Sequence, residues 1–450
     1  MINDKRSTQT VDNTSDDTVW VHDLSWDGRG VARRDDGRVL MIFGAIPGDL
    51  VIPEIRHEPN KGPVDCTIGE LVHESPQRVP HPCPHYARGC PASQLGAVRR
   101  EFSLDWKRTH LVETLRRIGG LEGVVVEPVI PSPKQWRYRE RLEFQVLRGQ
   151  NGLDMGYIGL SGLVPVLDCR LGATPLIKPF AALRRNLDYL DSHPHLGDRV
   201  PLRLLLRDNG RGEAIAVLFV LTRGPVDSAP LEEWLDSAGF AGWEIRRVRN
   251  QKLRYINSEL VISKGDPTVR IRIAGRDLIL QASVFSQVNR KAANELVNLM
   301  LEQVPEDGRL LDLYGGYGRF GIAYADRSGK ATVVDSAADA LSAGRDYVRK
   351  TGLPVEFRDI DLGRDDLAEL DAAVFDAAIL DPPHAGADEQ VLDMLNERGP
   401  ERIIYVSCHP AALARDLKRL TAYKTDLVVP IDMFPSTSEL ETLVILDRIS

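Results

Sequence analysis

From residue 288 to the end of the chain, short apolar segments alternate with amphipathic ones, and this alternation constrains the fold most strongly. Residues 288–304 carry apolar side chains at helical spacing, and strand-like segments follow. These segments span residues 310–314, 332–335, 355–358, 377–381, 403–407, 425–431 and 441–448. Strands that alternate with helices predict an α/β fold with a Rossmann-like, doubly wound parallel sheet. The close spacing of the last two strands predicts an antiparallel edge.

The part of the chain before residue 281 has a different pattern. Thr18 to Val72 contains short strand-like runs between turn signals, which predicts a small OB-like β-barrel. Leu104 to Ile118 predicts an amphipathic helix, after a Pro-, His- and Cys-rich stretch without periodicity. Farther on we expect strands over 142–147, 215–221 and 271–280 and a helix over 175–189. The expected units are a disordered tail (1–16), a barrel (17–75), a central α+β domain (76–280) and a C-terminal domain (281–450).

Charge and cysteine content limit the class of protein. The 450 residues carry a net charge of −8, which argues against a uniformly basic nucleic-acid binder. Residues 76–280, however, hold 31 Lys and Arg against 22 Asp and Glu, so they could supply a basic surface. Five cysteines are too few for a disulfide scaffold, and the polar start of the chain is no secretory signal. We therefore expect a cytoplasmic protein, and no apolar run is long enough to span a membrane.

Two basic runs with interleaved aromatic or apolar residues are candidates for RNA contact, or else are solvated strand faces. They are Lys134, Arg137, Tyr138, Arg139 and Arg141, and then Arg246, Arg247, Arg249, Lys252 and Arg254.

Residues 310–318, LLDLYGGYG, form an apolar strand that runs into a glycine-rich turn. Glycines let a ligand approach the backbone closely, and Asp335 at the end of the next strand could accept hydrogen bonds from ribose hydroxyls. The turn also suits a dinucleotide or a structural βα connection. Asp312 just before the turn could meet a cationic ligand, and the G-x-G-x-x-G spacing is missing. Both features favour S-adenosylmethionine over NAD.

Polar residues follow the next strands at the edge where open α/β sheets bind ligands. Asp381 lies in LDPPH, and Cys408 lies in YVSCHP just before an expected helix, whose N-terminus could lower the thiol pKa. A buried, inert cysteine is the alternative. Glu439 and Glu441 precede the last strand, where one could be a general base and the other solvated, or both could belong to a charged loop.

Five segments in this order resemble motifs of the class I S-adenosylmethionine-dependent RNA (uracil-5-)methyltransferases that carry a TRAM domain. They are FSQVNR, DLYGGYGRFG, LDPPHAG, YVSCHP and DMFPSTSELET, and GRGVAR…IFGAIPGDLV resembles the TRAM barrel. The resemblance implies that Cys408 is the nucleophile and Glu441 the base. It also implies cofactor and active-site roles for Gln287, Tyr314, Gly316, Asp335, Asp361 and Asp381. Arg319 and His409 stand where the family usually has Asn, and Glu439 where His is common.

The remaining cysteines bear on a metal site. The family often binds a [4Fe-4S] cluster through C-x5-C-x2-C and a distant fourth cysteine. Here Cys83 and Cys90 are separated by six residues, Ser93 holds the third-ligand position, and Cys169 fits the fourth. A cluster normally needs four thiolates, so a cluster on Cys83, Cys90 and Cys169 and the loss of the site both remain open.

The resemblance implies methyl transfer to C5 of a uridine through a covalent cysteine adduct on a flipped base. We expect 23S rRNA as the substrate and a monomeric enzyme. The alternatives are a tRNA T-loop uracil-C5 methyltransferase, an exocyclic-amine RNA methyltransferase and a non-catalytic RNA-binding factor.

Overall fold

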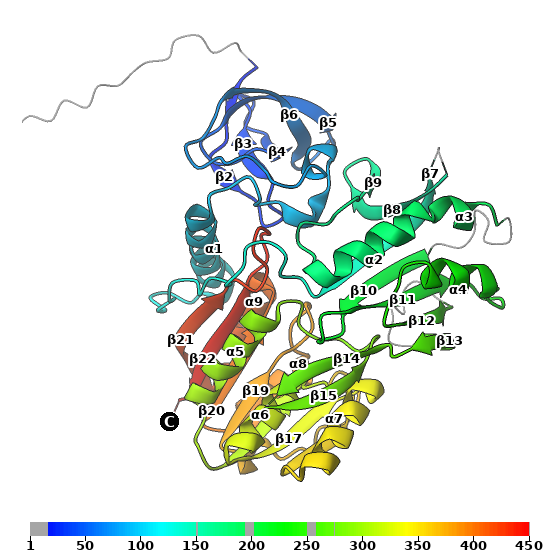
Figure 1. The fold of residues 1–450 in the computed structure, drawn as a ribbon. Coiled ribbons are helices and arrows are strands. Elements are labelled where there is room, and N and C mark those ends of the chain that lie inside the picture. The colour runs from blue at the N-terminus through cyan, green and yellow to red at the C-terminus, as the bar shows by residue number, and fades with distance from the viewer. Residues whose placement is uncertain (1–16, 150–151, 194–201, 250–257, 274, 450) are drawn as a thin grey trace, which may run out of the picture.

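The computed structural model describes residues 17–149, 152–193, 202–249, 258–273 and 275–449. The expected tail, residues 1–16, lies outside the described residues, as do Lys252 and Arg254. Three larger sheets and one hairpin organise the described chain, with the N-terminal sheet at the top of Figure 1 and the C-terminal sheet at the bottom.

The N-terminal sheet has six short strands in the order β1-β5-β6-β4-β3-β2. The strands are β1 (Val19–Trp20), β2 (Asp23–Leu24), β3 (Gly30–Arg33), β4 (Val39–Phe43), β5 (Leu50–His57) and β6 (Val64–His73). Alternate side chains such as Leu40 and Ile42 point inward and form a small core with Val51 and Val64. Figure 1 shows this sheet curled around that core.

The cysteine-containing segment forms two single 3₁₀ turns, Tyr86–Arg88 and Pro91–Ser93. Helix α1 (Arg100–Thr114) follows and continues as a π-helical segment, Leu115–Gly119. It begins four residues before Leu104, the start expected from the sequence. Leu111 and Leu115 pack into the core of the C-terminal sheet. This helix therefore ties the N-terminal part of the chain to the last domain.

The central sheet has the order β13-β12-β11-β10-β7-β8-β9. Its strands are β7 (Arg141–Gly149), β8 (Gly152–Gly159), β9 (Gly162–Pro165), β10 (Leu202–Asp208), β11 (Ala214–Leu221), β12 (Gly242–Val248) and β13 (Glu259–Gly265). Helices α2 (Thr174–Arg185), α3 (Leu187–Asp191) and α4 (Ala229–Asp236) accompany the sheet and share a core with it. The single helix expected over 175–189 is thus two helices that meet at Asn186.

The single strand expected over 271–280 is wrong. This region contains two strands, β14 (Thr268–Ile273) and β15 (Arg276–Gln281), which pair antiparallel. Gly275 between them has a φ of 74°, a left-handed conformation that glycine adopts without strain. The apolar alternation is the same in one long strand or in a hairpin, so the pattern alone could not separate them.

The C-terminal sheet confirms the doubly wound expectation, with the order β18-β17-β16-β19-β20-β22-β21. Its strands are β16 (Arg309–Leu313), β17 (Lys330–Asp335), β18 (Val355–Asp359), β19 (Ala377–Leu380), β20 (Arg402–Ser407), β21 (Tyr423–Ile431) and β22 (Glu441–Arg448). The helices are α5 (Arg290–Gln303), α6 (Arg319–Arg327), α7 (Ala338–Thr351), α8 (Glu389–Arg398) and α9 (Pro410–Arg419), with a 3₁₀ turn over Ala372–Val374. β16 to β20 are parallel, and β22 is antiparallel to both β20 and β21, as predicted.

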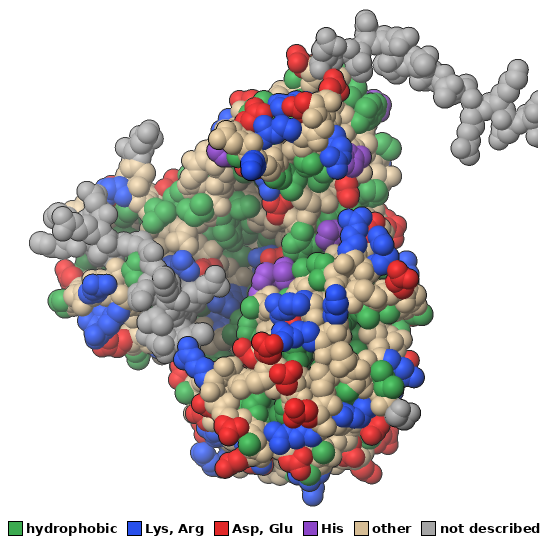
Figure 2. All heavy atoms as spheres, turned by 180° about the vertical axis from the view of Figure 1, so that it is seen from behind, with side chains coloured by type: hydrophobic (Ala, Val, Ile, Leu, Met, Phe, Trp, Pro, Cys, Tyr) green, Lys and Arg blue, Asp and Glu red, His purple; other side chains and the backbone are tan. Residues whose placement is uncertain are grey.

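Seen from behind, the surface is hollowed where these parts of the molecule meet (Figure 2). Basic and histidine side chains lie in and beside this hollow, whereas acidic side chains are frequent below it. Within the described residues, no helix combines the length and the hydropathy needed to cross a bilayer.

Candidate active site

The strand ends of the C-terminal sheet bring the predicted catalytic residues to one edge. β16, β19 and β20 run parallel, and β22 runs antiparallel beside β20 with Thr442 paired to Ser407. Asp381 follows β19, Cys408 follows β20, and Glu441 is the first residue of β22. An antiparallel strand starts where its neighbour ends, so the topology places the predicted nucleophile and base together.

The glycine-rich loop between β16 and α6 presents bare backbone to one side. Tyr314, Gly316 and Gly318 have φ values of 60°, 54° and 81°. A Cβ added to Gly316 would meet no atom within 4 Å, whereas one added to Gly315 would lie 2.7 Å from Val333 Cγ1. The loop therefore packs on the sheet at Gly315 and faces open space at Gly316, where a ligand can approach the backbone.

Asp335 and Asp312 hold this loop from two sides. The Gly316 N–H donates to Asp335 Oδ2 at 2.9 Å, and the Ala337 N–H donates to Oδ1 at 2.7 Å. Asp312 is fully buried beneath the loop, where its Oδ2 accepts from the Gly321 N–H at 2.9 Å. Because Asp312 is covered by the loop, it shapes the turn rather than meeting a ligand directly.

The other predicted cofactor residues lie around the loop but differ in their contacts. The Tyr314 hydroxyl donates to Asp388 Oδ2 at 3.0 Å and accepts from the Asp388 N–H at 2.9 Å. Asp361 lies in the turn after β18, where its Oδ1 accepts from the Gly363 N–H at 3.1 Å. Gln287 lies half-buried before α5, in a depression that Arg319 also lines.

Several carboxyl groups lie close together at this edge, and Asp312 among them is fully buried. Burial raises the pKa of Asp312 to about 8, and the nearby Asp381 and Asp335 raise it as well. Burial also raises the pKa of Asp381 to about 7, although the charge of Arg319 opposes this shift. Asp312 Oδ1 has no hydrogen-bond partner within the described residues. A cationic ligand at this edge would relieve the electrostatic cost of these groups.

Cys408 is a protonated thiol in this environment. Burial raises the pKa of Cys408 to about 12, and the carboxyl groups of Glu441, Asp381 and Glu439 act in the same direction. The N-terminus of α9, which begins two residues later, does not outweigh these effects, so the expected lowering is not found. Burial likewise raises the pKa of Glu441 well above its ordinary value, with Asp381 and Glu439 contributing.

The two glutamates before the last strand differ in exposure, as the sequence analysis allowed. Glu441 is 1% exposed, whereas the Glu439 side chain is half exposed and lies 3.8 Å from Arg139. Glu441, a buried carboxyl beside the thiol, is therefore suited to act as a proton acceptor, and its basicity depends on the ligand bound in the site.

The loop that carries both glutamates is anchored from other parts of the chain. Lys107 Nζ on α1 forms a buried ion pair with Asp432 Oδ1 at 2.7 Å and donates to the Phe434 carbonyl at 3.2 Å. The Tyr138 hydroxyl donates to the Pro435 carbonyl at 3.1 Å, and the Leu95 N–H donates to the Ser436 carbonyl at 3.0 Å. Lys107 gave no signal in the sequence, because a lysine on an amphipathic helix is ordinarily exposed.

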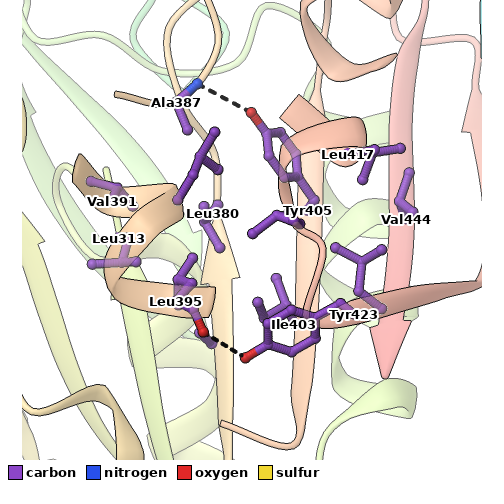
Figure 3. Close-up of a cluster of buried hydrophobic side chains, with 14 of the residues drawn as sticks. Leu313, Leu380, Ala387, Val391, Leu395, Ile403, Tyr405, Leu417, Tyr423 and Val444 are labelled. Carbon is purple, nitrogen blue, oxygen red and sulfur yellow. Dashed lines mark hydrogen bonds between the residues drawn. The ribbon is translucent and has the colours of Figure 1, made fainter. Parts of the chain in front are cut away.

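A second buried network fixes the loop after Asp381. The Tyr405 hydroxyl donates to Asp416 Oδ2 at 2.6 Å and accepts from the Ala387 N–H at 3.2 Å (Figure 3). The same carboxylate oxygen accepts directly from the Ala387 N–H at 2.8 Å. This network sits at the top of the apolar cluster formed by Leu380, Ile403 and their neighbours in Figure 3.

Two further features of the site were missed or only noted in passing by the sequence reasoning. Phe285 is 59% exposed, and the guanidinium of Arg141 lies 5.7 Å from its ring centre. The His384 and His409 rings lie 4.1 Å apart beside Cys408. Exposed rings are candidates for stacking on unpaired bases. The available signal was Phe285 itself, an aromatic residue that begins the FSQVNR motif.

The predicted metal ligands do not form a metal-binding group. Cys83, Cys90 and Cys169 are all buried free thiols, but the described residues contain no cluster of His, Cys, Asp or Glu that could hold a metal ion. Burial raises the pKa of Cys90 to about 11, and the nearby Cys169 and Cys83 act in the same direction. The cysteine set therefore does not fit an iron–sulfur cluster.

Hydrogen bonds occupy the positions where cluster ligands would be needed. The Leu167 N–H donates to His85 Nε2 at 2.9 Å, so the neutral ring carries its proton on Nδ1, 3.3 Å from Cys83 Sγ. The Cys83 N–H donates to His81 Nδ1 at 3.0 Å, and His81 Nε2 in turn donates to the Ser93 carbonyl at 3.0 Å. These imidazoles connect the two 3₁₀ turns without a metal.

Three members of the first basic run, Arg137, Tyr138 and Arg139, make contacts within the protein. Arg137 pairs with Asp168 at 2.5 Å and donates to the Cys169 carbonyl at 2.8 Å. Tyr138 is buried, and Arg139 Nε donates to its hydroxyl at 3.2 Å. These side chains support the fold at the junction of the domains.

The described members of the second basic run are also paired. Arg246 lies 3.0 Å from Glu244, and Arg247 and Arg249 lie 2.6 and 3.2 Å from Glu259.

Comparisons with known proteins decide the family. Residues 357–449 match the model described as tRNA (Uracil-5-)-methyltransferase, and residues 276–399 match the methyltransferase small domain. A 23S rRNA (uracil(1939)-C(5))-methyltransferase RlmD of Xanthomonas axonopodis pv. citri is 31% identical, over 98% of this chain and 99% of that protein. The chain belongs to the RNA uracil-C5 methyltransferase family. A second RlmD, from Alkalilimnicola ehrlichii, is 29% identical over 94% of this chain and 95% of its own length.

A solved structure shows the same fold. The tRNA (uracil-54, C5)-methyltransferase of Pyrococcus abyssi, in complex with S-adenosyl-L-homocysteine, superposes with a TM-score of 0.72 at 24% identity. The match covers 95% of this chain and 99% of that one. The resemblance stated from the motifs is thus confirmed at the level of family and fold, and the methyl donor of this uracil-C5 methyltransferase is S-adenosylmethionine.

The residues of the loop fit that donor. Gly316 offers open backbone, Asp335 lies at the end of β17 beside it, and a sulfonium would add positive charge at the edge where burial raises the pKa values of Asp312 and Asp381.

Proposed function

We propose that this uracil-C5 methyltransferase modifies a uridine of 23S rRNA, with Cys408 as the nucleophile and Glu441 as the base. The observation that supports these roles is the register of β20 and β22, which brings the thiol and a buried carboxyl together beside Asp381. Several similar proteins are 23S rRNA (uracil(1939)-C(5))-methyltransferases, and this favours rRNA as the substrate.

The chemistry that this site would perform begins at C6 of the uracil. The Cys408 thiolate adds to C6, and the electron pair of the C5=C6 bond moves to C5. S-adenosylmethionine, when bound, supplies an electrophilic methyl group, which C5 takes. Glu441 then removes the remaining C5 proton, the C5=C6 bond re-forms, and the thiolate leaves. The target base has to leave its stack to reach Cys408, so base flipping is part of the proposal.

The protonation states depend on the bound cofactor. In the ligand-free site, burial and the neighbouring carboxyl groups raise the pKa values of Cys408 and Glu441, which favours the protonated form of each group. A sulfonium cation beside Asp381 favours the anionic forms of the nearby groups. The nucleophile and base would therefore become active when the positively charged donor is present.

The test is the identification of the modified nucleoside and its position. Labelled methyl transfer to total RNA, followed by mapping in a strain without the gene, should give 5-methyluridine in 23S rRNA. The Cys408→Ala variant should bind S-adenosylmethionine within about twofold of the wild type but transfer no methyl group. Modification of the tRNA T-loop would instead favour the second candidate, a tRNA uracil-C5 methyltransferase. The fold match to a tRNA (uracil-54, C5)-methyltransferase is the reason to test it.

Cofactor binding is tested separately. Asp335→Ala removes the acceptor of the Gly316 N–H and the predicted ribose contact, so calorimetry should show markedly weaker S-adenosylmethionine binding. Methylation of an exocyclic amine, or binding of RNA without methylation, would overturn the proposed chemistry.

We further propose that residues 17–75, 76–280 and 281–450 are the three working units of a monomer that acts on RNA in the cytoplasm. Asp361, Gln287 and Tyr314 are proposed as additional cofactor contacts, because they surround the glycine loop or follow the neighbouring strands.

A further inference from the structure

Four arginines line a notch between the central sheet and the start of the C-terminal domain. They are Arg141 on β7, Arg207 on β10, Arg290 at the start of α5 and Arg319 at the start of α6. We call this the arginine notch. Glu140 and Asp208 also line it, so the positive side chains outnumber the negative ones.

Arg207 is a buried cation whose hydrogen-bond acceptors are neutral groups. Its guanidinium donates to the Ala282 carbonyl at 2.7 Å, the Val284 carbonyl at 2.5 Å and the Ser286 hydroxyl at 2.6 Å. Across the described part of the chain, no ion pair joins Arg207 to a carboxylate. Burial lowers the pKa of Arg207 to about 9, and the charge of Arg141 adds to this effect. Buried charges in proteins are normally compensated, so this position lacks a counter-charge.

Arg319 also makes its hydrogen bonds to neutral groups, although its charge acts on Asp381. It is 8% exposed, and it donates to the Tyr317 hydroxyl at 3.2 Å and to Asn294 Oδ1 at 2.8 Å. Its Nε is buried and has no hydrogen-bond partner in the described structure. An arginine N–H with no acceptor, in the wall of a notch, is available to an acceptor on a ligand.

The acidic side chains of the notch are already used. Glu140 forms an ion pair with Arg290 at 2.6 Å, and Asp208 Oδ1 accepts from the Gly210 N–H at 2.8 Å. Arg207 therefore has no ion pair within the described residues, and the Nε–H of Arg319 has no acceptor there, so both can receive an anion from outside the chain.

We propose that the arginine notch binds a phosphodiester group of the RNA adjacent to the target uridine, an inference that rests on the proposed function. Guanidinium groups match phosphate oxygens with paired donors, and phosphate contacts fix the position of a nucleic acid on a protein. The exposed ring of Phe285, which contacts Arg141, offers a stacking surface at the same place. Three of the four arginines lie outside the segment that carries the glycine loop, which favours RNA over the carboxylate of the cofactor.

The experiment measures RNA and cofactor binding separately for two variants and one control. Arg319→Asn and Arg141→Gln each remove one notch cation while sparing the fully buried Arg207. Arg349→Gln is the matched control, because it removes one exposed cation on α7 that does not line the notch. Dissociation constants are measured for an rRNA fragment at several salt concentrations, and for S-adenosylmethionine by calorimetry. Thermal melting checks that each variant is folded.

Both notch variants should bind RNA about tenfold more weakly than the control. Arg141→Gln should keep the affinity for S-adenosylmethionine, whereas Arg319→Asn also removes a charge that acts on Asp381. Each should also flatten the dependence of log Kd on log salt by about 0.7–0.9, the contribution of one phosphate contact. Weakened cofactor binding with unchanged RNA binding would show that the notch receives the cofactor carboxylate, which overturns the proposal. RNA binding and a salt slope equal to those of the control would overturn it as well.

The experiment distinguishes failure of the notch proposal from failure of the proposed function. If the wild-type protein binds the fragment but does not methylate uridine, the proposed function fails. The dissociation constants of the variants still test whether the notch binds the RNA. If the wild type methylates the fragment and the notch variants behave as the control, only the notch proposal fails.

Discussion

At the scale of single residues, the reactivity of Cys408 should depend on pH and on the charge of the bound cofactor. Since the pKa of this thiol is raised to about 12, it is protonated at neutral pH, and its alkylation should be slow and should accelerate as pH rises from 7 to 10. S-adenosylmethionine should increase the rate more than S-adenosylhomocysteine, which has nearly the same shape but no sulfonium charge. Iodoacetamide labelling followed by mass spectrometry measures this, with Cys408→Ala as the control for the buried thiols. Equal rates with both ligands would contradict the electrostatic account.

Glu441 acts, in the proposed reaction, only after the methyl group has been transferred. Glu441→Gln should therefore block removal of the C5 proton and trap a covalent protein–RNA species that survives a denaturing gel. Glu439→Gln is the matched control, because Glu439 is half exposed and faces Arg139 rather than the buried site. Accumulation of the adduct in Glu439→Gln, with normal turnover in Glu441→Gln, would move the role two residues upstream.

At the scale of elements, the buried pair between α1 and the loop after β21 should contribute strongly to stability. Lys107→Met leaves the Asp432 carboxylate buried without its partner, which typically costs about 3–5 kcal/mol. Chemical denaturation should show this loss, and Lys107→Met combined with Asp432→Asn should recover part of it because the unpaired charge is gone. A Lys107→Met variant as stable as the wild type would show that the pair does not anchor the loop.

At the scale of the whole molecule, we expect the fold to form without iron. His81 and His85 connect the cysteine-bearing turns by hydrogen bonds, and Ser93 replaces the third thiolate. Protein purified without oxygen should therefore be colourless and contain far less than one iron per chain. A brown protein with about four irons, bleached by Cys83→Ser, would contradict this expectation.

The sequence by itself determined the layout of the C-terminal sheet and the order of its motifs. Apolar strands between amphipathic helices can bury their surfaces in few ways, so the pattern predicted the parallel sheet and its antiparallel edge. The ends of such strands share one edge, which is why Asp381 and Cys408 could be placed together from local spacing. The hairpin at Gly275 and the break at Asn186 escaped prediction, because the apolar period is unchanged by a turn or a short interruption.

Only the tertiary structure decided the electrostatics. The sequence left open whether Cys408 is made acidic by a helix N-terminus or is a buried, inert thiol, and burial beside Glu441 and Asp381 raises its pKa. It also offered Arg137 and Tyr138 as RNA contacts or solvated strand faces, but both make contacts within the protein, whereas Arg207 donates to neutral groups in the interior. The physical reason is that burial and pairing depend on neighbours distant along the chain, and a local pattern does not contain them.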